Sequence, residues 1–421
     1  MSSLRVALIN TGFEEGEKGI MVSPPLGIMS IGACLRANGF EVRLFDWSNE
    51  PLDDAKERDL GGFAPDLVGL TVIMGSSIVR SKKASSWAKG MGSKVVWGGP
   101  FPSILGELSL RQAPVDYLVV GEGEGTMLEL CQALREGAPL SGIKGLAHLD
   151  GDKMRLEVRP RIRDLDSLPM PWWEGAGPLG KYLIPFYGRE AIPMVSSRGC
   201  PNTCSFCYTK AMWGYRWTSR SAAKVVDEIQ LVQHLEPRIS AVIFDDDLFA
   251  GDVERVLEFC KELKERGMDI AWNCELRARD IKEPLVTAMK DAGCVELLIG
   301  VETGSDRLLS SILKGVGRKE IAEAFRIAHK AGLRCNAMLM VGIPGETIED
   351  FRQTEALLKG LDADGYYFSL YLPSPGTAMF QLAKEHGFKE PSTLEEWADH
   401  YGYDVSQYPR VSMSEVPFDK V

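Results

Sequence analysis

The stretch that decides the fold reads Arg198-Gly199-Cys200-Pro201-Asn202-Thr203-Cys204-Ser205-Phe206-Cys207. It places three of the nine cysteines in the spacing C-x3-C-x2-C, directly after an apolar run at 192–197 that is typical of a β-strand. Three thiolates on one short loop can hold three irons of a cubane and leave the fourth iron open to a small molecule. Zinc is the rival metal, but a structural zinc site needs four ligands, and the nearest downstream histidine, His234, is poorly spaced. The pattern favours an iron–sulfur cluster on Cys200, Cys204 and Cys207.

The residues after this run alternate between strand and helix patterns. Strands are expected at 192–197, 241–245, 270–274, 296–301, 334–341 and 365–370, and helices at 222–234, 253–266, 283–292, 318–331, 348–360 and 379–386. Six strand–helix units are too few for a closed eight-unit barrel. The second half therefore predicts a partial (β/α)6 barrel of the TIM type.

The first 140 residues show a second α/β pattern. Strands fit 5–10, 41–46, 67–72, 94–97 and 117–120, with helices at 27–38, 77–89, 105–113 and 125–136. This alternation predicts a Rossmann-like, doubly wound parallel sheet that binds ligands at the carboxyl ends of its strands. A dinucleotide site is disfavoured, because the first strand leads into Asn10-Thr11-Gly12-Phe13 and not into G-x-G-x-x-G.

We expect an N-terminal domain at 1–140, a packed linker at 141–185, the partial barrel at 186–386 and a C-terminal extension at 387–421. The net charge of −11 argues against a general nucleic-acid binder. No stretch approaches the ~18 apolar residues of a membrane span, and the apolar run at the N-terminus is too short for a signal peptide. The simplest interpretation is a cytoplasmic enzyme.

The cysteine motif, with Phe206 before its third cysteine, resembles the signature of the radical SAM superfamily. The resemblance implies that the open iron of a [4Fe–4S] cluster binds the amino and carboxyl groups of S-adenosylmethionine. It also implies an external electron donor of the flavodoxin or ferredoxin type. The injected electron would cleave the sulfonium bond and produce a 5′-deoxyadenosyl radical.

The same resemblance assigns further residues at strand ends. Phe206 and the turn Gly342-Ile343-Pro344-Gly345 would flank the adenine. Glu302 would contact the ribose hydroxyls or the methionine amino group, and Arg277 the carboxylate, which suits a guanidinium fork. Without the resemblance, Glu302 and Arg277 would be interpreted as salt-bridged or solvated residues, and Gly342–Gly345 as an ordinary turn. Asp245–Asp247 could suggest a metal site, but we favour contacts with the nucleoside or the substrate.

The N-terminal part resembles the cobalamin-binding domains that are joined to radical SAM domains. The matching positions are Leu26, Gly27, Thr71, Met74, Gly75, Ser76, Gly98, Gly99, Pro100, Gly121, Glu122, Gly123 and Glu124. Glycine at such positions lets the backbone approach a broad, flat corrin closely. Many cobalamin domains supply a histidine below the cobalt, but the first histidine of this chain is His148. The lower face would then meet the loop 71–77 or water. The alternative is a sheet domain that has lost its cofactor.

Together, these resemblances predict a cobalamin-dependent radical SAM enzyme. The expected reaction is transfer of a methyl group from methylcobalamin to an unactivated carbon of a small-molecule or peptide substrate. A second candidate uses the same cofactors for cyclisation, ring contraction or another rearrangement without methyl transfer. A candidate of another class is a non-catalytic Fe–S or cobalamin carrier or sensor.

Overall fold

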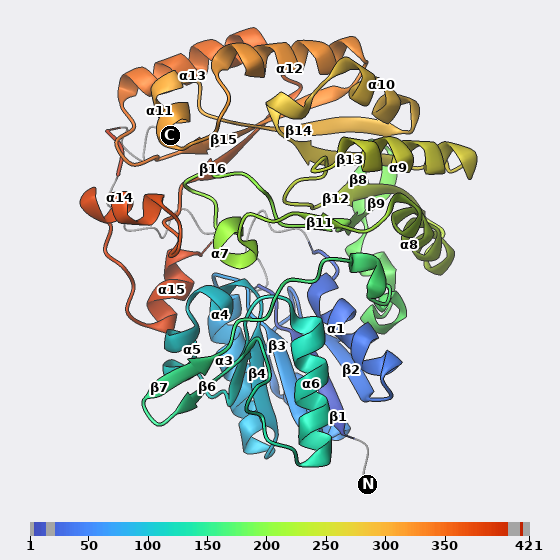
Figure 1. Cartoon of the computed structure of the whole chain (residues 1–421), viewed down its shortest axis with the longest axis vertical. Coiled ribbons are helices and arrows are strands. Elements are labelled where there is room, and N and C mark those ends of the chain that lie inside the picture. The colour runs from blue at the N-terminus through green and yellow to red at the C-terminus, as the bar shows by residue number, and fades with distance from the viewer. Residues whose placement is uncertain (1–3, 14–21, 403–412, 416–421) are drawn as a thin grey trace. The chain divides into compact units, whose positions relative to one another are not determined.

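The computed structural model describes residues 4–13, 22–402 and 413–415 (Figure 1). Contacts divide the chain into two units: residues 1–182 with 391–408, and residues 183–390 with 409–421. Each unit is built around its own seven-stranded sheet.

The sheet of the first unit has the order β2-β1-β3-β4-β5-β6-β7. Its strands are β1 (Arg5–Asn10), β2 (Glu41–Asp46), β3 (Leu67–Thr71), β4 (Lys94–Gly98), β5 (Tyr117–Val119), β6 (Leu146–Asp150) and β7 (Lys153–Leu156). Strands β1 to β5 are parallel, and β6 and β7 are antiparallel. The residues from Val6 to Ile9 are at most 1% exposed, as expected for a parallel strand covered on both faces. The predicted doubly wound sheet is confirmed.

The helices of this sheet differ from the expectation at two places. They are α1 (Leu26–Ala37), α2 (Asp54–Phe63), α3 (Ser77–Gly90), α4 (Pro100–Ile104), α5 (Gly106–Gln112) and α6 (Gly123–Glu136). The sequence pattern missed α2 because Leu60 is its only buried residue, so it has almost no apolar periodicity. The helix expected at 105–113 is preceded by the separate short helix α4, which ends before Leu105.

Two segments outside the expected N-terminal domain pack within the first unit. Strands β6 and β7 lie in the segment expected to be a linker and extend the sheet by antiparallel pairing. The short 3-10 helices η1 (Leu165–Ser167), η2 (Trp173–Ala176) and η3 (Leu179–Tyr182) follow them. Helix α15 (Leu394–His400) contacts α3 and α5, with Leu394 and Trp397 buried. Part of the expected C-terminal extension therefore belongs to this unit.

The sheet of the second unit has the order β16-β15-β14-β13-β12-β9-β8. Its strands are β8 (Ile184–Phe186), β9 (Arg189–Met194), β12 (Ile239–Phe244), β13 (Ala271–Leu276), β14 (Cys294–Glu302), β15 (Arg334–Val341) and β16 (Gly365–Leu370). All are parallel except β8, which pairs with β9 in a hairpin. In the described residues, the edge strands β16 and β8 do not pair with each other. The curled sheet stays open, so the predicted partial barrel is confirmed, with β8 as an additional strand.

Helices cover one face of this sheet (Figure 1). They are α8 (Ala222–Leu235), α9 (Val253–Glu265), α10 (Glu283–Asp291), α12 (Arg318–Lys330) and α13 (Ile348–Leu361). The 3-10 turn η4 (Ala278–Asp280) follows β13, the short helix α11 (Asp306–Ser311) follows β14, and α14 (Met379–Glu385) follows β16. A ribbon of β10 (Ser197–Arg198) and β11 (Thr218–Ser219) and the short helix α7 (Thr209–Trp213) flank the cysteine motif. Among the described residues, no helix is long and apolar enough to cross a membrane.

Candidate active site

The cysteine loop of the second unit is held in place by backbone hydrogen bonds from several elements. It follows β10 and leads into α7. The N–H of Ser205 donates to the carbonyl of Ile312 at 2.9 Å, and the carbonyl of Ser205 accepts from Met379 N–H at 3.0 Å. The N–H of Gly199 donates to Asp247 Oδ2 at 2.9 Å. The loop is therefore fixed by segments that follow β12, β14 and β16.

All three thiols of this loop are free and partly exposed. Asn202 Nδ2 donates to Cys200 Sγ at 2.9 Å, and Cys207 Sγ lies 3.1 Å from Thr209 Oγ1. Burial raises the pKa of both the Cys204 and the Cys207 thiols, and each is raised further by the charge of Cys200. The three sulfurs are therefore close enough to act on one another electrostatically.

These thiols fit a multi-iron cluster better than a single ion. Among the residues that the structure describes, no three His, Cys, Asp or Glu side chains are arranged to hold one metal ion. A cubane binds each cysteine sulfur to a different iron, so its ligands surround a volume and do not converge on a point. Three free thiols on one fixed loop are the donor set that such a cluster needs. The other six cysteines, which are scattered through apolar or helical stretches of the sequence, are all free and buried.

Two of the three aspartates after β12, Asp246 and Asp247, bind the chain itself. Asp246 is 1% exposed and accepts hydrogen bonds from the N–H groups of Ser196 and Ser197 at 2.7 and 2.8 Å. Asp247 accepts from Gly199 N–H and from Thr209 Oγ1. Both carboxylates position the ends of the cysteine loop. Our interpretation of the whole run as ligand contacts is therefore wrong for Asp246, because its carboxylate is buried against the chain.

Glu302 ends β14 in the left-handed region, with a φ of 64°. Its Oε1 accepts a hydrogen bond from Lys314 Nζ at 2.5 Å, and the two side chains are only 14% and 9% exposed. Burial acts to lower the pKa of Lys314, but Glu302 and the nearby thiols of Cys204 and Cys207 outweigh it and raise the pKa above its ordinary value. The sequence predicted a role for Glu302 but missed its partner.

Arg277 lies beside the cysteine loop, but its guanidinium is already engaged. Nε and one terminal nitrogen bind the carboxylate of Asp280 at 2.6 and 2.9 Å. The other terminal nitrogen donates to Asn202 Oδ1. Arg277 thus contacts the loop through Asn202, which itself donates to Cys200. The expected contact of Arg277 with the carboxylate of S-adenosylmethionine stays a prediction.

The structure brings Phe206 and the turn after β15 together. Ile343 is fully buried in an apolar cluster against which Phe206 packs. Gly342 and Gly345 have φ values of 77° and 74°, which a residue with a side chain rarely adopts. Gly342 N–H donates to Glu346 Oε2 at 2.9 Å, and Pro344 is buried. A rigid turn and an aromatic ring therefore share one apolar surface.

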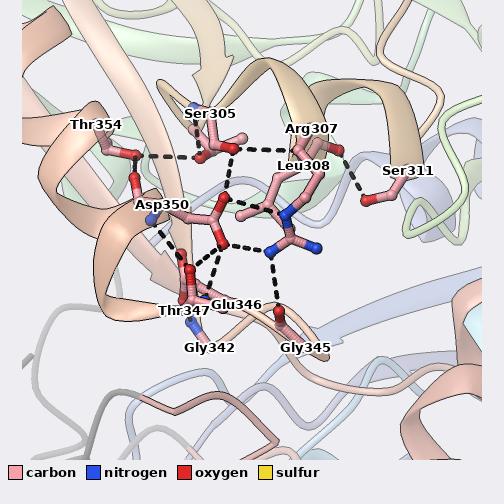
Figure 2. Close-up of polar contacts among 11 residues, drawn as sticks. Ser305, Arg307, Leu308, Ser311, Gly342, Gly345, Glu346, Thr347, Asp350 and Thr354 are labelled. Atoms are coloured by element: carbon pink, nitrogen blue, oxygen red, sulfur yellow. Dashed lines mark hydrogen bonds and ion pairs between the residues drawn. The ribbon is translucent and has the colours of Figure 1, made fainter.

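Asp350, at the start of α13, is the centre of a polar network that supports this turn (Figure 2). Its carboxylate accepts from Ser305 Oγ, from Thr347 N–H and Oγ1, and from the guanidinium of Arg307. Arg307 also donates to the carbonyl of Gly345 at 3.0 Å. The network joins the loop after β14 to the turn after β15. This network was not predicted from the sequence, although Thr347-x-x-Asp350 is a capping-box pattern that signals a helix start.

Glu275, near the end of β13, is a further carboxyl that the sequence did not single out. Burial raises the pKa of Glu275 to about 7, and neighbouring carboxylates add to the effect while one ammonium opposes it. The charged groups that act on it are Asp245, Asp247, Glu302 and Lys314. The carboxyl is therefore poised to gain or lose a proton near neutral pH.

The first unit places its predicted ligand loops at the carboxyl ends of β3 and β4. Gly99 has a φ of 99°, and a Cβ there would lie 2.9 Å from the carbonyl oxygen of Val72 and 3.1 Å from Thr71 Oγ1. The two loops thus approach each other at backbone distance. Gly75 also has a positive φ, and a Cβ there would lie 3.0 Å from the carbonyl oxygen of Tyr401. Helix α15 therefore ends directly against the loop 71–77.

The remaining predicted positions lie at or just before the starts of helices α1, α3, α4 and α6. Leu26 and Gly27 begin α1, and nothing lies within 4 Å of a Cβ at Gly27. The carboxylates of Glu122 and Glu124 are buried and accept from Ile162 N–H at 2.7 Å and from Ser30 Oγ at 2.8 Å. The remaining positions on these loops are Met74, Ser76, Gly98, Pro100, Gly121 and Gly123. Both glutamate side chains thus bind the chain itself, so a ligand contact there would use the backbone.

His400 lies in a different part of the structure from the one expected. The sequence put His400 in a separate extension, but α15 packs within the first unit, so His400 belongs to it. Its ring contacts those of Trp397 and Tyr401, with centroids 5.4 and 4.7 Å away. It packs in an aromatic group and does not follow the histidine-loop pattern of other cobalamin domains.

Comparisons with known proteins fit both sites. The sequence matches the Radical SAM superfamily over residues 194–358 and the B12 binding domain over residues 21–131. It is 32% identical over 397 residues to an uncharacterized methyltransferase of Pyrococcus horikoshii, covering 91% of this chain and 84% of that protein. It is 29% identical to the anaerobic magnesium-protoporphyrin IX monomethyl ester cyclase of Rubrivivax gelatinosus, covering 90% of this chain and 70% of that one.

Solved structures show the same architecture. The fold matches the radical S-adenosylmethionine methyltransferase TsrM from Kitasatospora setae, with cobalamin and a [4Fe–4S] cluster bound, at a TM-score of 0.76 and 19% identity. The match covers 95% of this chain and 82% of that one. The cobalamin-dependent radical enzyme OxsB with aqua-cobalamin matches at a TM-score of 0.75 and 20% identity, over 91% of this chain and 55% of that one. At these identities the likeness concerns the fold.

The fold and the two sites define a radical SAM enzyme with an added cobalamin-binding unit. The chain belongs to the cobalamin-dependent radical SAM enzymes, since both family matches and a full-length relative above 30% identity agree. Its cofactors are those of the family: a [4Fe–4S] cluster, S-adenosylmethionine and cobalamin. The predictions of family, enzyme and cofactors are confirmed. Its relatives include methyltransferases, as the main functional prediction requires, and also cyclases.

Proposed function

We propose that the protein is a methyltransferase that acts on an unactivated carbon of a small-molecule or peptide substrate. In this proposal Cys200, Cys204 and Cys207 hold the cluster. The single observation that carries it is the cysteine loop, which bears three free thiols and is fixed by hydrogen bonds from segments that follow three different strands. The bound cofactors supply a carbon-centred radical and a transferable methyl group.

The chain's own residues hold and orient these groups. The rigid turn 342–345 and Phe206 offer a flat apolar surface that suits an adenine ring. Glu302 offers a second carboxylate oxygen beside the one that binds Lys314, and it can accept from a hydroxyl or ammonium group. The glycines of the loops after β3 and β4 let the backbone approach a corrin. Orientation of reactants in this way accelerates a reaction by removing translational freedom.

The experiment separates methyl transfer from the other candidates without knowledge of the substrate. The full chain is purified anaerobically, loaded with cluster and cobalamin, and incubated with S-adenosylmethionine and a chemical reductant. A methyltransferase forms S-adenosylhomocysteine as well as 5′-deoxyadenosine. A rearrangement enzyme forms 5′-deoxyadenosine alone, and a carrier or sensor forms neither.

Two single cysteine variants, one in the loop and one outside it, provide the test and its matched control. Cys204→Ala should lose bound iron and 5′-deoxyadenosine formation but keep cobalamin binding. Cys260→Ala, which changes a buried cysteine of α9, should keep all three. Full iron content in the Cys204→Ala protein would overturn the assignment of the loop. Absence of S-adenosylhomocysteine from the wild-type protein would overturn methyl transfer.

A further inference from the structure

Lys314 occupies a strained and closely held position after α11. Leu313 and Gly315 on either side of it both have positive φ values, of 54° and 72°. A left-handed conformation is unfavourable for a residue with a side chain such as Leu313, and such strain persists where the surroundings impose it. The carbonyl of Gly315 accepts from Arg279 at 2.8 Å, and Lys314 N–H donates to the carbonyl of Leu309. The chain is thus bent sharply at the one residue that carries the ammonium.

The bend directs the ammonium into the half-barrel. Lys314 Nζ lies 2.5 Å from Glu302 Oε1, and its side chain is only 9% exposed. A Cβ at Gly300 would lie 2.6 Å from this nitrogen, so the absence of a side chain at Gly300 provides the room for it. A buried ion pair requires such a fit, because removing both charges from water is costly.

The same segment holds the cysteine loop. The carbonyl of Ile312, two residues before Lys314, accepts the backbone N–H of Ser205 at 2.9 Å. The charge of Lys314 acts on the thiols of Cys204 and Cys207. A buried cation therefore lies next to the predicted cluster ligands, and a carboxylate partly compensates its charge.

We propose that the positive charge of Lys314 raises the reduction potential of the cluster and that the negative charge of Glu302 lowers it. This inference rests on the proposed function, in which the cysteine loop holds the cluster. One-electron reduction adds a negative charge at the cluster, and a nearby cation stabilises that charge in a low-dielectric site. The pair of Lys314 and Glu302 then sets how much of this stabilisation the cluster receives.

The test measures the midpoint potential of the cluster by electron paramagnetic resonance, without S-adenosylmethionine. In Lys314→Met, the ratio of reduced to oxidised cluster at a fixed potential should fall about tenfold, which is about 59 mV for one electron. In Glu302→Gln, the ratio should rise, because the ammonium loses its partner. The double variant should lie near the wild type. Lys319→Met, which changes an exposed lysine of α12, is the control and should not shift the potential.

The sign of the two shifts distinguishes charge from structure. A merely structural pair would give shifts in the same direction, or none, and either result would overturn the proposal. If Lys314→Met fails to take up a cluster, the direction in Glu302→Gln decides alone: a rise supports the proposal, and a fall or no change rejects it. Failure of the wild-type protein to assemble a cluster would instead reject the proposed function.

Discussion

Replacing Asp350 with Asn tests the network that supports the turn after β15. Asp350 is 3% exposed, and its carboxylate accepts from Ser305, Arg307 and Thr347 (Figure 2). Burial acts to raise the pKa of Asp350, but the hydrogen bonds from Arg307, Ser305 and Thr347 outweigh it and hold the pKa well below its usual range. The network therefore depends on a charged carboxylate.

The loss of local stability in Asp350→Asn can be estimated from the hydrogen bonds that an asparagine amide keeps and those that it loses. With its oxygen toward Thr347, the Asn side chain still accepts from the N–H and the hydroxyl of that residue, and its NH2 group can donate to Ser305. It can no longer accept from Arg307 Nε, and it loses the charge that strengthens every bond. Hydrogen bonds to charged groups contribute about 1.5–3 kcal/mol each. The Arg307 side chain is 58% exposed, so its share is reduced by solvent. We expect a total loss of about 2 kcal/mol.

Hydrogen exchange of the full chain measures this loss where it occurs. Two kcal/mol corresponds to about 30-fold faster exchange by local opening. The reporter is the amide of Gly342, which donates to Glu346 and not to Asp350 itself. Glu355→Gln on the same helix is the matched control, because the pair of Glu355 with Lys359 is exposed and should leave exchange unchanged. Equal exchange of Gly342 in Asp350→Asn and wild type would refute the reasoning.

The pH dependence gives a second check on the same variant. A carboxyl whose pKa is lowered by folding contributes stability above its unfolded-state pKa of about 3.9 and loses that stability as the pH falls below it. The wild-type turn should therefore open progressively in acid. Asp350→Asn should lack this part of the acid loss.

Two further predictions concern Glu275 and Gly75. Because the pKa of Glu275 is raised to about 7, the folded protein binds more protons than the unfolded chain between about pH 4.3 and 7, and stability falls as the pH rises through this window. Glu275→Gln should remove that fall. At pH 8 its free energy of unfolding should exceed that of wild type by about 3–4 kcal/mol, since one pKa unit corresponds to about 1.4 kcal/mol, and urea denaturation measures this difference; parallel pH profiles would contradict it. Gly75→Ala should cost more than Gly39→Ala, because both have positive φ but only Gly75 has a close neighbour, the carbonyl of Tyr401. Thermal unfolding checks this difference, and equal losses would show that α15 does not constrain the loop.

Much of the fold could be predicted because buried parallel strands are nearly continuous apolar runs. The apolar runs that form β1, β12 and β15 are 6, 6 and 8 residues long, which suits a buried strand and is short for a helix. Helix α2 was missed for the opposite reason, since its surface is polar and its start depends on a cap by Asp53. The placement of α15 in the first unit could not be predicted, because it depends on contacts with residues far earlier in the chain, such as the pair of Glu395 with Lys82, 313 residues before it.

The candidate site could be predicted where chemistry lies in consecutive residues. The cysteine loop and the turn at 342–345 were visible as local patterns. The partners that fix the site were not visible, because they lie many residues away in the sequence. Lys314 is twelve residues from Glu302, and Ser305 is 45 residues from Asp350. Asp246 was misinterpreted because burial decides whether an aspartate in a run binds the chain or a ligand, and burial is not visible in the sequence.

These contacts link the two halves of the candidate site within the second unit. Asp350 holds Ser305, which caps the N-terminus of α11. At the other end of this six-residue helix, the carbonyl of Ile312 holds Ser205 of the cysteine loop. A helix this short moves as one piece, so a shift of the turn at 342–345 is transmitted to the cysteines through α11. If so, Asp350→Asn should also speed exchange of the Ser205 amide, although Asp350 makes no hydrogen bond to the cysteine loop among the described contacts. Faster exchange at Gly342 with unchanged exchange at Ser205 would show that the two loops are held independently.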